Sequence, residues 1–264
     1  MTRMGSFAVV CVVLLAATVA FLALPVVGIL TDVPPGDLID GLRDPAARDA
    51  LRLSLTTSLA AVGLIVLFGT PAAWFLATRR FRGRGLLITV IELPLVLPPA
   101  VAGIGLLAAL GPRGLLGPAL DDAGLRLVLE TAGVVVALTF VASPYFIRQA
   151  IAGFAALDPA VLAASRTLGA GEARTFFRIG VPLTRGVLGA GAALAWGRAL
   201  GEFGATLLFA GSLRGVTQTA PLAIYERFST SFTGALSLSV VLITASLAVL
   251  VVTRLVTRSD DAQA

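Results

Sequence analysis

The sequence predicts an all-α integral membrane protein with six transmembrane helices. Apolar residues make up 57% of its 264 residues and charged residues only 13%, whereas a soluble domain usually carries about 25% charged residues. A surface so poor in charge suits lipid, in which a helix satisfies its own backbone polar groups. The length leaves room for about six spans of ~20 residues with loops between them. We therefore expect one transmembrane domain over residues 1–264 and no separate soluble domain.

Several residue types are absent, which excludes whole classes of function. The chain contains no His and no Lys, and its one cysteine, Cys11, lies in the first apolar run. A His-ligated metal site and an internal disulfide are therefore excluded. A P-loop needs a Lys to reach the nucleotide phosphates. We expect a transport subunit rather than an enzyme, with no catalytic residue, metal or cofactor of its own, and with ATP and Mg²⁺ bound by a partner subunit.

The apolar runs define the expected spans. They lie at residues 7–30, 53–78, 86–110, 131–151, 186–210 and 234–253. A signal peptide is the competing interpretation of the first run, because Arg3 precedes an apolar core. That run is long for a signal core, and no small-x-small cleavage motif follows before Pro25. We therefore expect a retained first span.

Arginine clusters predict the orientation, because basic loops stay on the cytoplasmic side of a cell membrane. The 79–84 loop holds four Arg and no acid, the region from 148 to 185 has a net charge of +3, and two Arg follow the last span. The 31–49 and 111–130 loops have net charges of −3 and −1 and are expected outside. Both chain termini are thus expected in the cytoplasm, around a multi-pass domain in the inner or plasma membrane.

The third run contains an acidic residue and several prolines. Glu92 is followed by Pro94, Pro98 and Pro99. A carboxylate inside a membrane costs ~2.5 kcal/mol or more unless it is paired or hydrated, and prolines leave backbone carbonyls that neighbours or water must satisfy. One interpretation places Glu92 on a translocation path. The other places it near the cytoplasmic interface, a few residues after Arg84.

The fifth run contains two opposite charges, Arg198 and Glu202. Residues four apart share a helix face, so these two side chains can pair. Ionisable residues this deep in an apolar run indicate a functional site by default. The alternative is a self-neutralising pair near the outer end of the helix.

The 157–183 region between the fourth and fifth runs is charged and helix-forming. Asp158 and Pro159 are typical of a helix start, and Gly169 to Gly171 predict its end and a sharp turn. Ala163, Ala164 and Ser165, then Gly169, Ile179, Val181 and Pro182 have the spacing of the Glu-Ala-Ala signature of ABC-importer permeases. The region resembles that signature, although Ala163 stands where the family usually has Glu and Val181 where it usually has Leu.

This resemblance implies a cytoplasmic coupling helix that docks into a separate ATP-hydrolysing subunit. The alternative is an ordinary basic loop between two membrane helices. The residues expected to take part in coupling are Asp158, Ala163, Ala164, Ser165, Arg166, Gly169, Glu172 and Pro182.

Three further stretches resemble oxyanion permeases. ELPLVLPPAVAG in the third run resembles molybdate and sulfate permeases, and RALGEFGAT from Arg198 to Thr206 resembles molybdate, tungstate and sulfate permeases. TQTAPLAIY from Thr217 to Tyr225 resembles molybdate permeases. The resemblance implies a translocation path that includes Glu92, Pro98, Arg198, Glu202, Phe203, Gly204 and Thr206. It also implies a contact with an external binding protein at Thr217, Gln218 and Tyr225.

The resemblance as a whole implies the type I ABC-importer permease fold. It further implies a homodimer with the pore between its two copies, two cytoplasmic ATPase subunits, and an extracytoplasmic solute-binding protein. The expected solute is a tetrahedral oxyanion, molybdate or tungstate, with sulfate or thiosulfate as the alternative. Two other classes stay open: an ion-coupled secondary carrier that titrates Glu92 and Glu202, and a non-transporting membrane scaffold.

Overall fold

A computed structural model describes residues 6–34, 36 and 43–261, and the regular structure in these residues is entirely helical. The helices are α1 (Ser6–Thr31), α3 (Pro45–Thr78), α4 (Arg84–Val96), α5 (Pro99–Leu110), α6 (Gly117–Asp122), α7 (Thr131–Ala155), α8 (Pro159–Thr167), α9 (Glu172–Thr175), a π-helical turn (Phe176–Gly180), α10 (Val181–Leu200), α11 (Gly204–Ala210), α12 (Ala220–Phe228) and α13 (Phe232–Asp261).

The described helices include four that are long and apolar enough to cross a membrane. These helical stretches are Phe7–Thr31, Pro45–Thr78, Thr131–Ala155 and Glu172–Leu200. The pair α4 and α5 makes a fifth span if it is counted as one. The Phe232–Ala248 part of α13 is apolar as well but shorter. Each run expected from the sequence therefore lies in helix, although the helices differ from the runs in length and shape.

Two of the expected spans are broken. The span expected near 86–110 divides at Leu97 and Pro98 into α4 and α5, whose axes are bent by 118°. Consecutive prolines cause this break, because each lacks an N–H group and restricts the residue before it. The span expected near 186–210 also divides, since α10 ends at Leu200 and α11 begins at Gly204.

The core lies around α7, which packs between α3 and α10. Small and aromatic side chains fill it, among them Ala61 on α3, Leu138 and Phe146 on α7, and Ala195 on α10. Small residues let membrane helices approach closely. Van der Waals packing then holds the helices together, because the hydrophobic effect does not drive their association inside lipid. Because α7 is covered on several sides, a side chain of this helix that reaches the surface is an exception.

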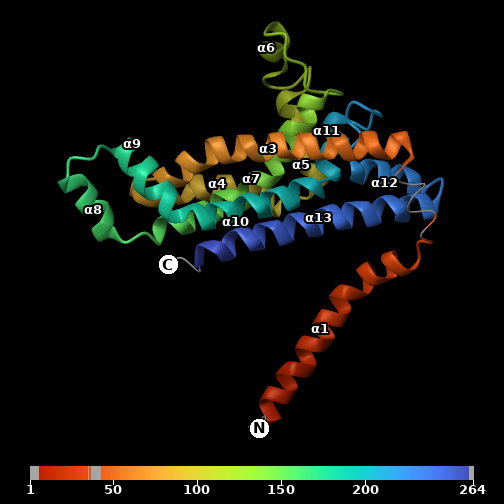
Figure 1. Ribbon diagram of the computed structural model, residues 1–264. Coiled ribbons are helices and arrows are strands. Elements are labelled where there is room, and N and C mark those ends of the chain that lie inside the picture. Colours follow the sequence, from red (N-terminus) through yellow and green to blue (C-terminus); the bar gives the residue numbers. More distant parts are fainter. Residues whose placement is uncertain (1–5, 35, 37–42, 262–264) are drawn as a thin grey trace.

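The first helix, α1, diverges from the bundle and contacts α13 (Figure 1). Its apolar window is 0% buried in this chain. A helix that is apolar all round must be covered by lipid or by protein. The surface of α1 is therefore available to the bilayer or to another chain.

The bundle has two distinct ends (Figure 1). We call the end that carries the 79–84 loop, α8 and α9 the basic end. The opposite end carries α12 and the start of α3, where Arg227 pairs with Asp44 and the Ala220 N–H donates to Ser54 Oγ at 2.7 Å. Asp44 also caps α3 by accepting from the Ala46 N–H at 2.9 Å, so that α3 starts eight residues before the apolar run.

Candidate functional site

Apart from Glu92, the residues singled out in the sequence gather in three places: at the basic end, at the two helix breaks, and at the opposite end. At the basic end, α8 has the expected start and stop. Asp158 Oδ1 accepts a hydrogen bond from the Ala160 N–H at 2.8 Å, and Gly169 adopts a φ of +80°, which favours glycine. Ala163, Ala164 and Arg166 are exposed on this helix. A short, capped helix therefore presents an open face away from the bundle.

The 157–183 region is attached to the long helices by a hydrogen bond and by aromatic packing. The hydroxyls of Ser165 on α8 and Thr175 share a buried hydrogen bond of 2.7 Å. Phe176 packs against Trp74 of α3, with ring centroids 5.6 Å apart. Trp74 in turn meets Phe154 of α7 edge-on at 5.2 Å. Packed side chains thus connect α8 and α9 to α3 and α7.

An ion pair at the surface supplements these contacts. Arg79 Nη2, at the end of α3, lies 2.7 Å from Oε2 of Glu172 on α9. Both side chains are about half exposed, so this pair adds little stability. The hydrogen bond to Glu172 and its negative charge raise the pKa of Arg79 above its ordinary value. Pro182, the last of the expected coupling residues, is exposed in the first turn of α10.

At the break in the fifth span, Arg198 and Glu202 form the pair that their spacing predicts. Arg198 Nη2 lies 2.6 Å from Glu202 Oε2, with 26% and 1% of the side chains exposed. The second carboxylate oxygen, Oε1, accepts a hydrogen bond from the Ala205 N–H at 2.8 Å. Glu202 therefore joins the last turn of α10 to the first turn of α11, and its charge serves to hold the break together.

The two breaks pack on one another. A Cβ atom built on Gly204 would lie 2.8 Å from Pro99 Cβ, which is too close for a larger residue. Pro98 is exposed beside this contact, whereas Thr206 is buried and its Oγ1 has no hydrogen-bond partner in the described chain. The structure thus brings Pro98, Glu202, Gly204 and Thr206 into the same break region.

At the opposite end, the structure links two sets of residues that the sequence kept apart. Phe203, in the break, packs against Tyr225 of α12, with ring centroids 5.0 Å apart. Tyr225 is 63% exposed. Thr217 and Gln218, which were also expected to contact a binding protein, are both buried. Thr217 accepts from the Leu213 N–H at 2.8 Å and Gln218 donates to Glu226, so both shape the loop from within.

Glu92 also has a partner that the sequence analysis missed. Arg148 Nε on α7 lies 3.2 Å from Glu92 Oε1 on α4. These side chains are 64% and 36% exposed, respectively. Nothing in the local sequence signals this pair, because 56 positions separate its members and only the packing of α4 on α7 joins them.

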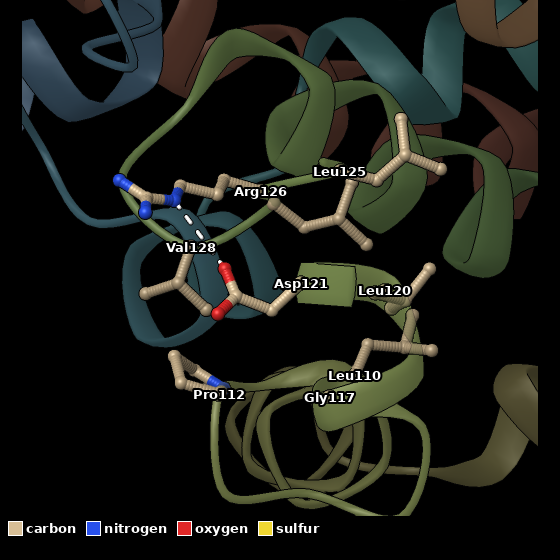
Figure 2. Close-up of a pocket in the computed structure, with 9 residues that line it drawn as sticks. Leu110, Pro112, Gly117, Leu120, Asp121, Leu125, Arg126 and Val128 are labelled. Carbon is tan, nitrogen blue, oxygen red and sulfur yellow. Dashed lines mark ion pairs between the residues drawn. The ribbon is translucent and has the colours of Figure 1, made fainter. Parts of the chain in front are cut away.

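A cavity of about 350 Å³ lies apart from all of these residues, between α6 and the segment that leads into α7 (Figure 2). Apolar side chains such as Leu110 and Val128 line it. Arg126 and Asp121 pair across its rim, with Nε and Oδ1 3.5 Å apart. Both charges are largely exposed, so the pair is an external feature of the 111–130 loop and not part of the break region.

Comparison with known proteins identifies this class of membrane protein. A solved bacterial ABC transporter, which is involved in the import of the acidic polysaccharide alginate, has a similar fold. The fold matches one of its chains with a TM-score of 0.74 over 95% of both chains, at 16% identity. Residues 66–261 match the family model described as binding-protein-dependent transport system inner membrane component.

Relatives at higher identity agree with this assignment. The molybdenum transport system permease protein ModB of Mycobacterium tuberculosis is 43% identical over 229 residues, 86% of each chain. The molybdate/tungstate transport system permease protein WtpB of Pyrococcus abyssi is 33% identical over 240 residues, 89% of this chain and 90% of the relative. The chain belongs to the family of binding-protein-dependent transport system inner membrane components and is a multi-pass cell membrane protein.

Proposed function

We propose that this chain is the permease subunit of an ATP-driven importer for molybdate or tungstate. The observation that carries the proposal is the 43% identity to a molybdenum permease over 86% of both chains. The charge chemistry is compatible, since a guanidinium group matches a tetrahedral oxyanion. No cofactor is assigned to the chain itself, and ATP with Mg²⁺ belongs to partner ATPase subunits.

The basic end faces the cytoplasm in this proposal, because its arginine-rich loops belong on that side. Two ATPase subunits bind there, each receiving an α8 helix. The opposite end faces outward and receives the solute-binding protein, with exposed Tyr225 as its contact. Two copies of the chain enclose the pore, and both chain termini lie in the cytoplasm.

The contacts around α8 supply the mechanical link for alternating access. When ATP draws the ATPase subunits together, α8 moves with them. The buried Ser165–Thr175 hydrogen bond carries this movement to α9, and the packing of Phe176 on Trp74 carries it to α3. A rigid connection of this kind allows one element to bias a two-state assembly.

The break region forms the outer part of the solute path. Breaks in membrane helices occur where the backbone lines a cavity or is buried in protein. Phe203 and Tyr225 close over this region from two different elements. A binding protein that displaces Tyr225 would therefore act directly on the residue next to Glu202.

Reconstitution tests the function and the solute together. The chain and its partner ATPase would be placed in liposomes, and ATP hydrolysis measured with binding protein loaded with molybdate, tungstate or sulfate. Stimulation by molybdate or tungstate but not by sulfate is the expected result. Stimulation by sulfate alone would keep the importer class and overturn the solute, and failure of the ATPase to associate would favour a secondary carrier.

The coupling role of α8 is tested by Ser165→Ala. Loss of the buried hydrogen bond leaves the Thr175 hydroxyl with only its bond to the Gly171 carbonyl, at a cost of about 1 kcal/mol. We expect the ATPase to stay bound while the ratio of solute transported to ATP hydrolysed falls. Thr167→Ala is the matched control, because its exposed hydroxyl bonds only within α8, to the Ala163 carbonyl. Equal coupling ratios in the two variants would contradict the role of Ser165.

A further inference from the structure

The pair of Glu92 and Arg148 lies inside the span and not at its end. Glu92 is eight residues from the start of α4 at Arg84, and Arg148 is seven residues before the end of α7 at Ala155. At 1.5 Å per residue these positions are about 12 Å and 10 Å from the basic end of their helices. The pair therefore sits on the cytoplasmic half of the bundle if the proposed orientation holds.

Arg148 is an exposed residue of α7, the long helix that the rest of the chain covers most. From Gly133 to Ile151, all of which the structure describes, Arg148 is the one exposed residue of α7. Its side chain is 64% exposed and that of Glu92 is 36% exposed. Charged groups at this depth face water or protein and not hydrocarbon. The face of α4 and α7 that holds this pair must then line an aqueous path or the junction between two copies of the chain.

The guanidinium of Arg148 has donors to spare. The Nε atom contacts Glu92. The described part of the chain supplies no other polar partner for the guanidinium group. Its two terminal NH₂ groups are thus open to a ligand. A planar fork of N–H donors binds two oxygens of a tetrahedral oxyanion at once. The exposed pair with Glu92 contributes little to stability, so an incoming anion can replace the carboxylate.

From this geometry we infer that Arg148 is a binding site for the oxyanion on the cytoplasmic side of the path, with Glu92 as its displaceable counterion. The inference rests on the proposed function. In the empty state, Glu92 neutralises Arg148. In the occupied state, the displaced carboxylate stays close to the bound anion and repels it. Such a site binds the solute weakly enough to release it, as conduction requires.

The experiment uses the reconstituted complex of this chain with its ATPase and binding protein, and measures the rate of molybdate transport alongside ATP hydrolysis. Arg148→Gln is expected to slow transport at least about tenfold, because it removes a charge-assisted bond to the anion. Arg148→Lys should restore part of the rate. Arg126→Gln is the matched control, since it removes an exposed, acid-paired Arg far from the path, and it should transport at the wild-type rate.

A charge swap, Glu92→Arg with Arg148→Glu, separates binding from structure. If the pair serves only to join α4 to α7, the swapped pair restores transport, and the inference is overturned. If Arg148 holds the anion, the swap does not restore it, because an acid now stands at that position. Normal transport by Arg148→Gln also overturns the inference while leaving the proposed function intact. A wild-type complex that moves no oxyanion would overturn both.

Discussion

The two Arg–Glu pairs of this chain use the same chemistry in opposite ways. Glu202 is 1% exposed and uses both carboxylate oxygens, one on Arg198 and the other on the Ala205 N–H. Glu92 is 36% exposed and makes a single contact with Arg148. The buried pair fixes a helix break, because releasing either partner would leave an unpaired charge in a poorly hydrated site. The exposed pair is labile, so its arginine is free to exchange partners.

The comparison changes the interpretation of the fifth span. The sequence offered Arg198 and Glu202 as a translocation site, with a self-neutralising pair as the alternative. The hydrogen bond from the Ala205 N–H favours a structural role for Glu202. Arg198 is 26% exposed, so its guanidinium is not fully enclosed by the chain. The depth of a charged residue in the membrane therefore does not show whether that residue binds a solute or stabilises the fold.

The largest expected effect is that of Glu202→Ala. The substitution leaves Arg198 without its counterion and the Ala205 N–H without its acceptor, and we expect a loss of about 3 kcal/mol in the free energy of unfolding. Thermal unfolding of the complex in detergent measures this loss. Wild-type stability in this variant would show that the carboxylate does not hold the break.

A second test examines the packing of the same break. A Cβ on Gly103 of α5 would lie 2.9 Å from the Ala205 carbonyl oxygen, so Gly103→Ala should cost about 1–3 kcal/mol through overpacking. Gly105→Ala on the same helix is the control, because a Cβ there has nothing within 4 Å. It should be neutral or slightly stabilising. Chemical or thermal unfolding compares them, and equal stabilities would argue against close packing of α5 on α11.

The smallest expected effect on stability is that of Glu92→Ala. An exposed pair with one contact contributes less than about 1 kcal/mol, so the unfolding temperature should stay close to that of the wild type. Measured beside Glu202→Ala under the same conditions, this variant completes the comparison. A loss as large as that of Glu202→Ala would mean that the Glu92–Arg148 pair also braces the fold.

Much of the local structure could be predicted from residues close in sequence. Asp158 and Pro159 predicted the start of α8, Gly169 its end, and the spacing of Arg198 and Glu202 their ion pair, because each depends on helix geometry over a few positions. The prolines of the third run predicted freed backbone carbonyls, but the division of that span into α4 and α5 and the 118° bend between them came from the structure. The apolar runs predicted the membrane, since composition alone determines which solvent a surface tolerates.

The tertiary structure decided what depends on contacts between distant segments. It placed Arg148 beside Glu92, Phe203 against Tyr225, and the two helix breaks against each other. It also buried Thr217 and Gln218, for which the resemblance had implied a contact with a binding protein. The physical reason is that burial and pairing depend on which helix faces pack together. Local propensity determines the helices of this chain, whereas packing determines which of their charges stay free to meet a ligand.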